Sequence, residues 1–447
     1  MRVVTDADLD ESLGTDGPVP LNEPRDGVPT PLVHADELTR VVEVLAAGSG
    51  PVAVDAERAS GYRYGQAAYL VQLRRADLGT VLIDPRALSD LSALGAAIGA
   101  DEWVLHAASQ DLPCLAELGM RPVRVFDTEL AGRLLGYPRV GLGAMVEQVL
   151  GLTLEKGHSA ADWSTRPLPD PWLRYAALDV EVLVELRDVL AGELDAGGKR
   201  EWAEQEFAAV VAAPPPSPRV DPWRRTSGIN RLRTRRQLAV VQSLWERRDS
   251  VARSRDIAQG RILPDAALVG AALAQPATES ELVELPVWGG RSIRRQTATW
   301  LPAIETALRR PEADLPPLKL PSEGPPPPRS WADRDPLAAA RLAAARLAVG
   351  TVAEKHNLPV ENLLTPDTVR RLAWSPPGPS GDGPLDADVV AGFLRAHGAR
   401  PWQVQETAEV LAQALVSARV PDPAAVADSV EVAGAAGDRD HGAYSPD

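Results

Sequence analysis

The sequence predicts an α/β domain, with a mixed sheet flanked by helices, followed by one or two all-α helical bundles. Three closely spaced apolar runs at 51–57, 68–74 and 79–85 have strand character and are expected to pair antiparallel. Two further strand-like runs, 102–107 and 123–128, then alternate with helical patterns as far as residue 194. Beyond a proline-rich stretch at 212–222 the apolar residues have helical spacing, which predicts the bundles.

Composition divides the 447 residues into seven segments. They are an acidic arm at 1–30, predicted to be disordered, the α/β domain at 31–211, a linker at 212–222, a helical domain at 223–309, a second proline-rich linker at 310–334, a second helical domain at 335–416 and an acidic tail at 417–447, also predicted to be disordered. The two helical domains are similar in length, but their identity is too low to establish a repeat.

The net charge of −15 is distributed unevenly. Residues 1–28 hold seven acids and two arginines, and residues 421–447 hold six acids and one arginine, so each end carries −5. Residues 221–261 hold 11 arginines and four acids, a local balance of +7. The overall acidity therefore does not exclude a nucleic-acid partner, because phosphate binding depends on the local charge.

Cysteine usage and hydropathy indicate a cytoplasmic location. Cys114 is the single cysteine, which excludes an internal disulfide and a multi-cysteine zinc site. The acidic N-terminus has no signal-peptide pattern, and no stretch approaches about 18 uninterrupted apolar residues. The sequence therefore predicts no membrane association, and it indicates no obligatory protein partner.

Paired carboxylates end the first strand of the predicted sheet. Asp55 and Glu57 are two residues apart, so their side chains point to the same face of the strand. Open sheets place ligand sites at strand ends, and two adjacent carboxylates repel unless a cation lies between them. A lone D-x-E pattern is weak evidence, because it also occurs at solvated strand ends.

Two further acids, Asp111 and Asp179, lie later in the predicted α/β domain. Asp111 comes after a later strand, where the simpler explanation is an acid that complements a helix N-terminus. Tyr175 and Asp179 are four residues apart on a helix, on a face that Leu183 continues and that Glu181 does not share. A buried Asp179 needs a partner, and a metal ion would supply one.

Together these residues resemble the three motifs of the DEDD exonuclease superfamily on a ribonuclease-H-like fold. Tyr175 marks the tyrosine branch, because the histidine branch would place histidine where this chain has Arg174. The strings FDTELAGRLLG (126–136) and DWSTRPL (162–168) are similar to ribonuclease D. The segment 223–309 resembles the HRDC domain of that family, and 335–416 resembles a second, more divergent copy.

The resemblance implies a 3′→5′ exoribonuclease that uses two Mg²⁺ or Mn²⁺ ions and releases 5′-mononucleotides. Asp55 would bridge both ions, Glu57 and Asp179 would complete one ion's shell, Asp111 would hold the other, and Tyr175 would orient the attacking water. Its partner would be RNA, at the single-stranded 3′ ends of tRNA precursors and other stable RNAs. The motifs also allow a 3′→5′ DNA exonuclease or a non-catalytic RNA-binding module.

Other conspicuous residues are expected to be structural. Asp127 is predicted to cap a helix, and His106, Cys114 and Trp163 to pack in the core. Lys156 and His158 are also kept out of the catalytic set. For the arginines of 231–255, a solvated helix surface and a sequence-independent RNA contact are equally compatible with the sequence.

Overall fold

A computed structural model describes residues 17–420, except 156, 159, 216, 218, 289, 291–295, 321–323 and 379–384. It contains two compact units. The first comprises the chain to Gly132, Arg139–Ala196 and Phe207–Pro321, and the second comprises Arg133–Pro138, Gly197–Glu206 and the chain from Ser322 onward. The predicted boundary of the α/β domain at residue 211 does not coincide with this division, because short parts of that domain belong to the second unit.

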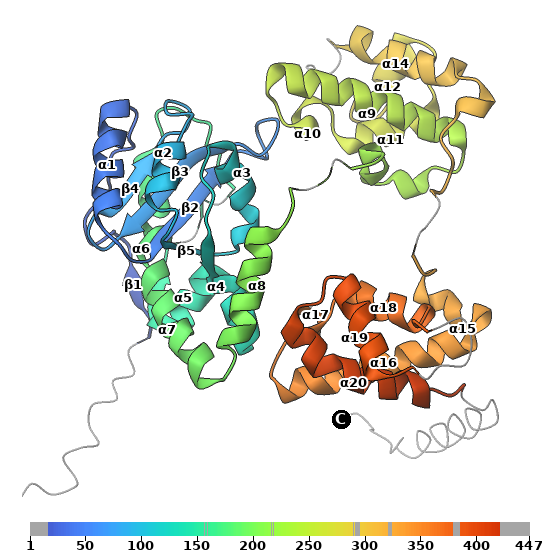
Figure 1. Cartoon of the computed structure of the whole chain (residues 1–447). Helices are drawn as coiled ribbons and strands as arrows, with labels where there is room; N and C mark the ends of the chain where they lie inside the picture. Colours follow the sequence, from blue (N-terminus) through green and yellow to red (C-terminus); the bar gives the residue numbers. More distant parts are fainter. Residues whose placement is uncertain are drawn as a thin grey trace, which may run out of the picture. The chain divides into compact units, whose positions relative to one another are not determined.

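A five-stranded mixed sheet organises the first unit (Figure 1). Its order is β4-β3-β2-β5-β6, formed by β2 (Val52–Arg58), β3 (Ala68–Arg75), β4 (Gly79–Ile83), β5 (Glu102–Leu105) and β6 (Arg124–Asp127). The predicted antiparallel arrangement of the first three strands is confirmed, and β5 and β6 extend the sheet in parallel with β2. The carboxyl ends of three parallel strands therefore meet at one edge.

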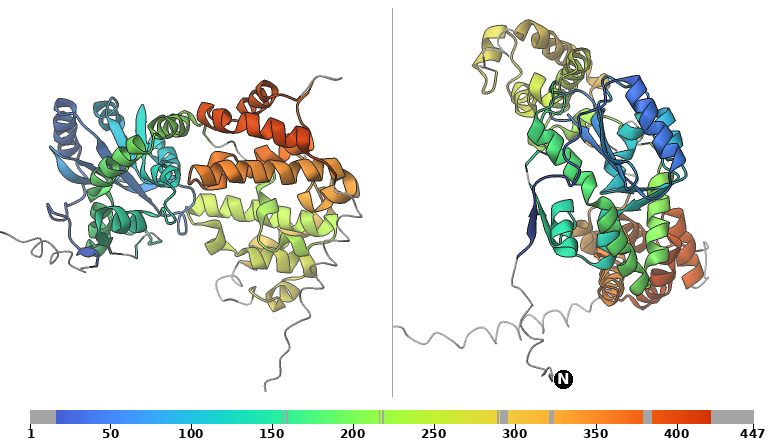
Figure 2. Two further views of the ribbon diagram at one scale, coloured as in Figure 1. Left: turned by 90° about the horizontal axis from the view of Figure 1, so that it is seen from below. Right: turned by 90° about the vertical axis from the view of Figure 1, so that its left-hand side faces the viewer.

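Helices cover both faces of this sheet. α6 (Asp170–Glu181) and α7 (Leu183–Ala196) pack against β2 and its neighbours, and α1 (Ala35–Ala47) lies on the opposite side, as Figure 2 shows in its right-hand view. The remaining elements up to the first linker are α2 (Ser92–Ala97), η1 (Ala108–Gln110), α3 (Leu112–Glu117), α4 (Thr128–Leu135), α5 (Leu142–Leu150), β7 (Leu152–Leu154) and α8 (Arg200–Ala212).

The prediction that residues 1–30 form a disordered arm is wrong for residues 17–30. β1 (Val19–Leu21) pairs in parallel with β7, and the Val19 amide donates to the Gly151 carbonyl at 2.8 Å. Arg25, further along, forms an ion pair with Glu185. Backbone pairing orders this segment together with ion pairs made by Glu23, Arg25 and Asp26, and the polar, proline-containing composition indicates neither.

The helix predicted at 171–194 is two helices, with Val182 between α6 and α7. The expectation that Glu181 lies off the buried face is also wrong, because α6 is buried on more than one side. Glu181 is 2% exposed, and its carboxylate lies 3.2 Å from Nη1 of Arg74. A regular helical period cannot anticipate a change of direction between two helices.

The rest of the first unit is helical, as predicted. It contains η2 (Pro222–Arg225), η3 (Ile229–Arg231), α9 (Arg235–Arg255), α10 (Gln259–Ile262), α11 (Asp265–Ala274), α12 (Glu279–Glu284), α14 (Thr297–Arg309) and η4 (Glu312–Asp314). Buried Trp223, Trp288 and Trp300 belong to its core.

Three arginines of this helical region are structural. Arg235 and Arg236 of α9 donate to backbone carbonyls of the segment that follows α14. Arg248 is 3% exposed and donates to Asp265 at 2.7 Å. For these three the contacts favour stabilisation of the bundle over a role in binding RNA.

The second unit contains η5 (Pro328–Ser330), α15 (Trp331–Arg334), α16 (Pro336–Lys355), α17 (Val360–Leu363), α18 (Pro366–Trp374), α19 (Ala387–Ala396) and α20 (Pro401–Ser417). The rings of Trp202 and Trp402 stack at 4.6 Å and join the start of α8 to this bundle. α16 is long and apolar enough to span a membrane by length and composition alone. That is weak evidence, because Leu342 and Val349 of the same helix are buried in the bundle.

Candidate active site

The central strand of the sheet positions the first two carboxylates. β2 pairs with β3 on one side and β5 on the other, and Val52, Ala53 and Val54 are fully buried. Asp55 and Glu57 follow at the carboxyl end of the buried run, where the alternation of a strand sends both side chains to the same face. The rigid centre of the sheet therefore fixes the distance between them.

Asp111 is carried by a turn that Asp127 stabilises. After β5 the chain turns at Ala107, whose φ of 60° lies in the left-handed region that non-glycine residues seldom adopt. The Asp127 carboxylate accepts hydrogen bonds from the amides of Ala107 at 3.1 Å and Ala108 at 2.8 Å. It also accepts from the amides at the start of α4, so its predicted capping role is confirmed. Asp111 stands at the N-cap of α3 but makes no side-chain capping hydrogen bond to it.

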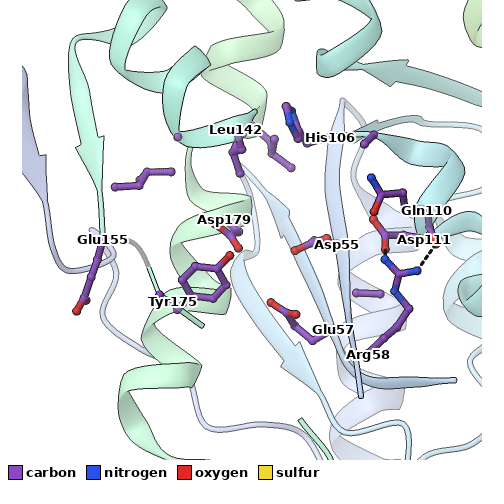
Figure 3. A pocket seen from close by; sticks show the side chains of 16 residues that line it. Asp55, Glu57, Arg58, His106, Gln110, Asp111, Leu142, Glu155, Tyr175 and Asp179 are labelled. Atoms are coloured by element: carbon purple, nitrogen blue, oxygen red, sulfur yellow. Dashed lines mark hydrogen bonds and ion pairs between the residues drawn. The ribbon is translucent and has the colours of Figure 1, made fainter. Parts of the chain in front are cut away.

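Tyr175 and Asp179 reach the cleft from α6. Val180 and Leu183 belong to a buried cluster with Ala53 of β2 and Val104 of β5, and this packing fixes the end of α6 against the sheet. Figure 3 shows the Tyr175 hydroxyl and the Asp179 carboxylate pointing toward Asp55.

Three of the predicted carboxylates converge. One oxygen each from Asp55, Glu57 and Asp179 lies within 4.8 Å of the other two. They line a cleft of about 450 Å³ together with Asp111 and Tyr175. All five residues predicted from the sequence therefore lie around the same cleft, although Asp111 is outside the group of three.

Burial raises the pKa of the four predicted carboxyls, and the charges of neighbouring acids add to the rise for Glu57, Asp111 and Asp179. Burial raises the pKa of Asp55 to about 6. Burial, followed by the charge of Asp55, raises the pKa of Asp111 to about 8. The same two causes raise the pKa of Asp179 well above its usual range, and the hydrogen bond from the Tyr175 hydroxyl offsets part of that rise. Burial and the other three acids raise the pKa of Glu57 well above its usual range. Protein groups alone thus leave the carboxylates poorly compensated.

The donor set fits divalent metal ions. Oxygen ligands from carboxylates are those that hard cations such as Mg²⁺ and Mn²⁺ prefer. Among the residues that the structure describes, no lysine or arginine forms an ion pair with Asp55, Glu57 or Asp179. A cation would offset the repulsion that raises their pKa values.

Sequence relatives share this architecture. Residues 31–195 match the family model described as 3'-5' exonuclease. The chain is 29% identical over 361 residues to a ribonuclease D of Gluconacetobacter diazotrophicus, covering 78% of this chain and 88% of that protein. It is 33% identical over 291 residues to ribonuclease D of Escherichia coli, covering 63% of this chain and 75% of that protein. The chain belongs to the ribonuclease D family. As a member of that family it is a 3′→5′ exoribonuclease.

Solved structures agree with membership of the ribonuclease D family. A protein from Bifidobacterium adolescentis matches with a TM-score of 0.82 and 38% identity, covering 90% of this chain and all (100%) of that one. E. coli ribonuclease D matches with a TM-score of 0.60 and 28% identity, covering 82% and 99%. The ribonuclease-H-like nuclease domain followed by helical domains is therefore confirmed, and the exonuclease fold implies divalent metals.

The family models assign different names to the two helical domains. Residues 237–304 match the HRDC domain, as expected for ribonuclease D. Residues 324–415 match a model described as 3' to 5' exonuclease C-terminal domain. The interpretation of this last domain as a divergent HRDC copy stays a prediction, as do the exact domain limits.

The residues set aside as structural have distinct surroundings in this ribonuclease D relative. Trp163 and Cys114 are buried, as predicted. His106 Nδ1 lies 2.9 Å from Thr128 Oγ1, and burial lowers the pKa of His106 to about 4, so the ring is neutral although it borders the cleft. His158 contacts the Tyr175 ring edge-on at 5.7 Å, a contact that no sequence pattern indicated. Lys156 lies outside the described residues.

Arg58 is a cleft residue that no sequence pattern singled out. Its guanidinium Nη2 lies 3.3 Å from Oδ1 of Asp111 (Figure 3). A basic residue directly after the D-x-E pattern was the available signal. Strand alternation suggested that it would point away from Glu57, and the pairing irregularity between these two residues is invisible in the sequence.

Proposed function

We propose that this enzyme removes nucleotides one at a time from RNA 3′ ends with two divalent metal ions, Mg²⁺ or Mn²⁺, held by Asp55, Glu57, Asp111 and Asp179. The convergence of three carboxylate oxygens within 4.8 Å, without a cationic side-chain partner among the described residues, is the observation that carries the proposal. The position of Asp111 on the same cleft supports a second ion beside the first.

Each residue has a separable role in the proposal. Asp55, at the centre of the sheet, would contribute to both ions, while Glu57 and Asp179 would complete the shell of one and Asp111 would hold the other. When bound, such a pair of ions stabilises the attacking and leaving oxygens of an in-line displacement at phosphorus. The hydroxyl of Tyr175 would accept or donate a hydrogen bond to the attacking water and so fix its direction.

Tyr175 is suited to orientation rather than to proton abstraction. Burial, followed by the charges of Asp179 and Glu57, raises the pKa of Tyr175 far above its usual value. The phenol therefore stays protonated at physiological pH and acts as a hydrogen-bonding group. The Tyr175 ring also makes an edge-on contact with His158.

RNA is the favoured substrate, and products would be 5′-mononucleotides. The solved E. coli relative is described as an exoribonuclease involved in structured RNA processing. By this likeness we propose that the chain trims single-stranded 3′ ends of tRNA precursors and other stable RNAs in the cytoplasm. The cleft acids act on phosphate and do not distinguish sugars, so a DNA exonuclease is the alternative to test.

The test is digestion of end-labelled oligomers by the purified full-length protein. With 5′-labelled RNA in Mg²⁺ or Mn²⁺ we expect a ladder that shortens one nucleotide at a time, and with 3′-labelled RNA immediate release of a labelled mononucleotide. EDTA should abolish both results. Internal cuts, activity in EDTA, or faster degradation of the matching DNA oligomer would contradict the proposal.

A further inference from the structure

Arg58 brings a positive charge into the carboxylate cleft. Among the described residues that line the cleft it is the one arginine or lysine. Its Nη2 lies 3.3 Å from Oδ1 of Asp111, and its Nη1 donates to the Gln110 carbonyl at 2.9 Å. The side chain of Arg58 is 25% exposed, whereas that of Asp111 is 8% exposed, so the cation keeps access to solvent while its partner is nearly enclosed.

Arg58 enters the cleft beside an irregularity in the pairing of β2 with β3. In a regular strand, adjacent residues point to opposite faces, so Arg58 would face away from Glu57. The β2–β3 pairing shifts register between Glu57 and Arg58. The extra residue there is Tyr69 of β3, and bulges of this kind are common beside active sites, where they disrupt the regular pairing. The strand thus presents acids and a cation to one cleft within four consecutive residues.

Arg58 competes with a metal ion for Asp111. A divalent cation close to Asp111 is repelled by a guanidinium only a few ångströms away, and the repulsion is twice that felt by a proton at the same place. The pair between Arg58 and Asp111 can therefore form only when no metal ion is bound to Asp111. Metal binding at Asp111 would favour movement of Arg58 away from it. Its partial exposure and flexible stem allow that movement.

A neighbouring hollow would accommodate the Arg58 guanidinium once it leaves Asp111. Arg58 also borders a neighbouring hollow of about 270 Å³, which Ser60, Gly61, Tyr62 and Ala161 line with it. Glu57 and Arg58 border both spaces, so the hollow adjoins the carboxylate cleft. An RNA strand whose end lies at the carboxylates would carry its next phosphates past this position, and a guanidinium fork matches phosphate geometry.

We propose that Arg58 pairs with Asp111 in the metal-free enzyme and, when a divalent ion occupies Asp111, binds a backbone phosphate of the RNA strand. The inference rests on the proposed function, because it assigns one more residue to the same site. In this proposal Arg58 exchanges one partner for the other. Removing it should therefore strengthen the binding of the metal ion and weaken the binding of RNA.

The test compares Arg58→Gln with the wild-type chain in two binding measurements. Calorimetric titration with Mn²⁺ should show about fivefold tighter binding, because a competing cation is gone. Anisotropy titration with a single-stranded RNA oligomer in Ca²⁺ should show weaker binding. The slope of the logarithm of affinity against the logarithm of salt concentration should fall by about 0.7, the value for one lost phosphate contact on a single strand.

Matched variants separate this role from a general charge effect. Arg40→Gln removes an exposed cation that pairs with Asp36 on α1, outside the cleft, and should change neither measurement. Arg58→Lys retains the charge but not the fork, so it should keep the wild-type Mn²⁺ affinity and salt slope while binding RNA less tightly. This variant also tests the inference if Arg58→Gln does not fold, since tighter Mn²⁺ binding by Arg58→Lys would contradict it.

The contradicting results are distinct from those that would refute the proposed function. If the wild type binds both ligands, and Arg58→Gln leaves either the Mn²⁺ affinity or the RNA salt slope unchanged, Arg58 has no exchange role. If the wild type binds neither Mn²⁺ nor RNA, the proposed function is refuted, and so is this inference, which rests on it.

Discussion

Replacing Asp55 by asparagine should stabilise the metal-free protein at pH 8. The folded protein raises the pKa of Asp55 from 3.8 to about 6, mainly through burial. A carboxyl with a raised pKa contributes stability below its unfolded value, near 3.8, and that contribution is lost as the pH rises through 6. At pH 8 the ionised Asp55 is therefore a cost to folding, which asparagine removes.

The magnitude follows from the size of the shift. A rise from 3.8 to about 6 corresponds to about 3 kcal/mol. The asparagine amide is itself buried at this position, which costs part of that amount, and we expect a net gain of about 1–2 kcal/mol in the free energy of unfolding. At pH 5 the substitution should have about half of its pH 8 effect, because the unfolded chain is already ionised there while the folded Asp55 is largely protonated.

Urea unfolding followed by circular dichroism in EDTA, at pH 5 and pH 8, measures this difference. Saturating Mg²⁺ should reverse the sign at pH 8, because the wild type gains about 2.7 kcal/mol from an ion present at 100 times its dissociation constant and the variant has lost a ligand. Glu43→Gln, at an exposed position of α1, is the matched control and should change nothing. Destabilisation of Asp55→Asn in EDTA at pH 8, or equal Mg²⁺ stabilisation of both proteins, would refute the reasoning.

Three further substitutions test separate parts of the structure. Tyr175→Phe should lower kcat about 10²-fold in single-turnover digestion while leaving Mn²⁺ affinity unchanged, because it removes only an orienting hydroxyl; an unchanged kcat would exclude that role. Asp127→Asn should cost about 2 kcal/mol in urea unfolding, since its two oxygens accept four backbone hydrogen bonds, and a neutral effect would show that the turn before Asp111 does not depend on them. Trp402→Ala should destabilise the second unit by about 3–4 kcal/mol in calorimetry, whereas Val416→Ala at an exposed site should cost under about 0.5 kcal/mol, and equal effects would contradict the proposed importance of the Trp202 stack.

The sequence predicted the parts of the site that depend on local periodicity. Asp55 and Glu57 are two residues apart on a strand, and Tyr175 and Asp179 are four residues apart on a helix, so their directions follow from backbone geometry. The sheet that brings them together was predictable in outline, because the order of strands and helices restricts the topology.

Features that depend on tertiary contacts were not predictable in the same way. The pairing of Glu181 with Arg74 depends on the approach of α6 to β3. β1 is ordered by three residues of backbone pairing, which composition does not record. The position of Arg58 depends on a register shift between strands. Asp111 could be assigned only through its resemblance to the exonuclease motifs, because its contacts come from distant segments.

The most direct test of the two-metal proposal is the nuclease activity of Asp179→Asn. With the fold verified by circular dichroism and Glu43→Gln as the control, Mg²⁺-dependent shortening of a 5′-labelled RNA should be roughly 10³-fold slower than in the wild type. Affinity for the RNA in the absence of metal should be retained. Undiminished Mg²⁺-dependent activity in Asp179→Asn would contradict the assignment of the cleft as the catalytic metal site.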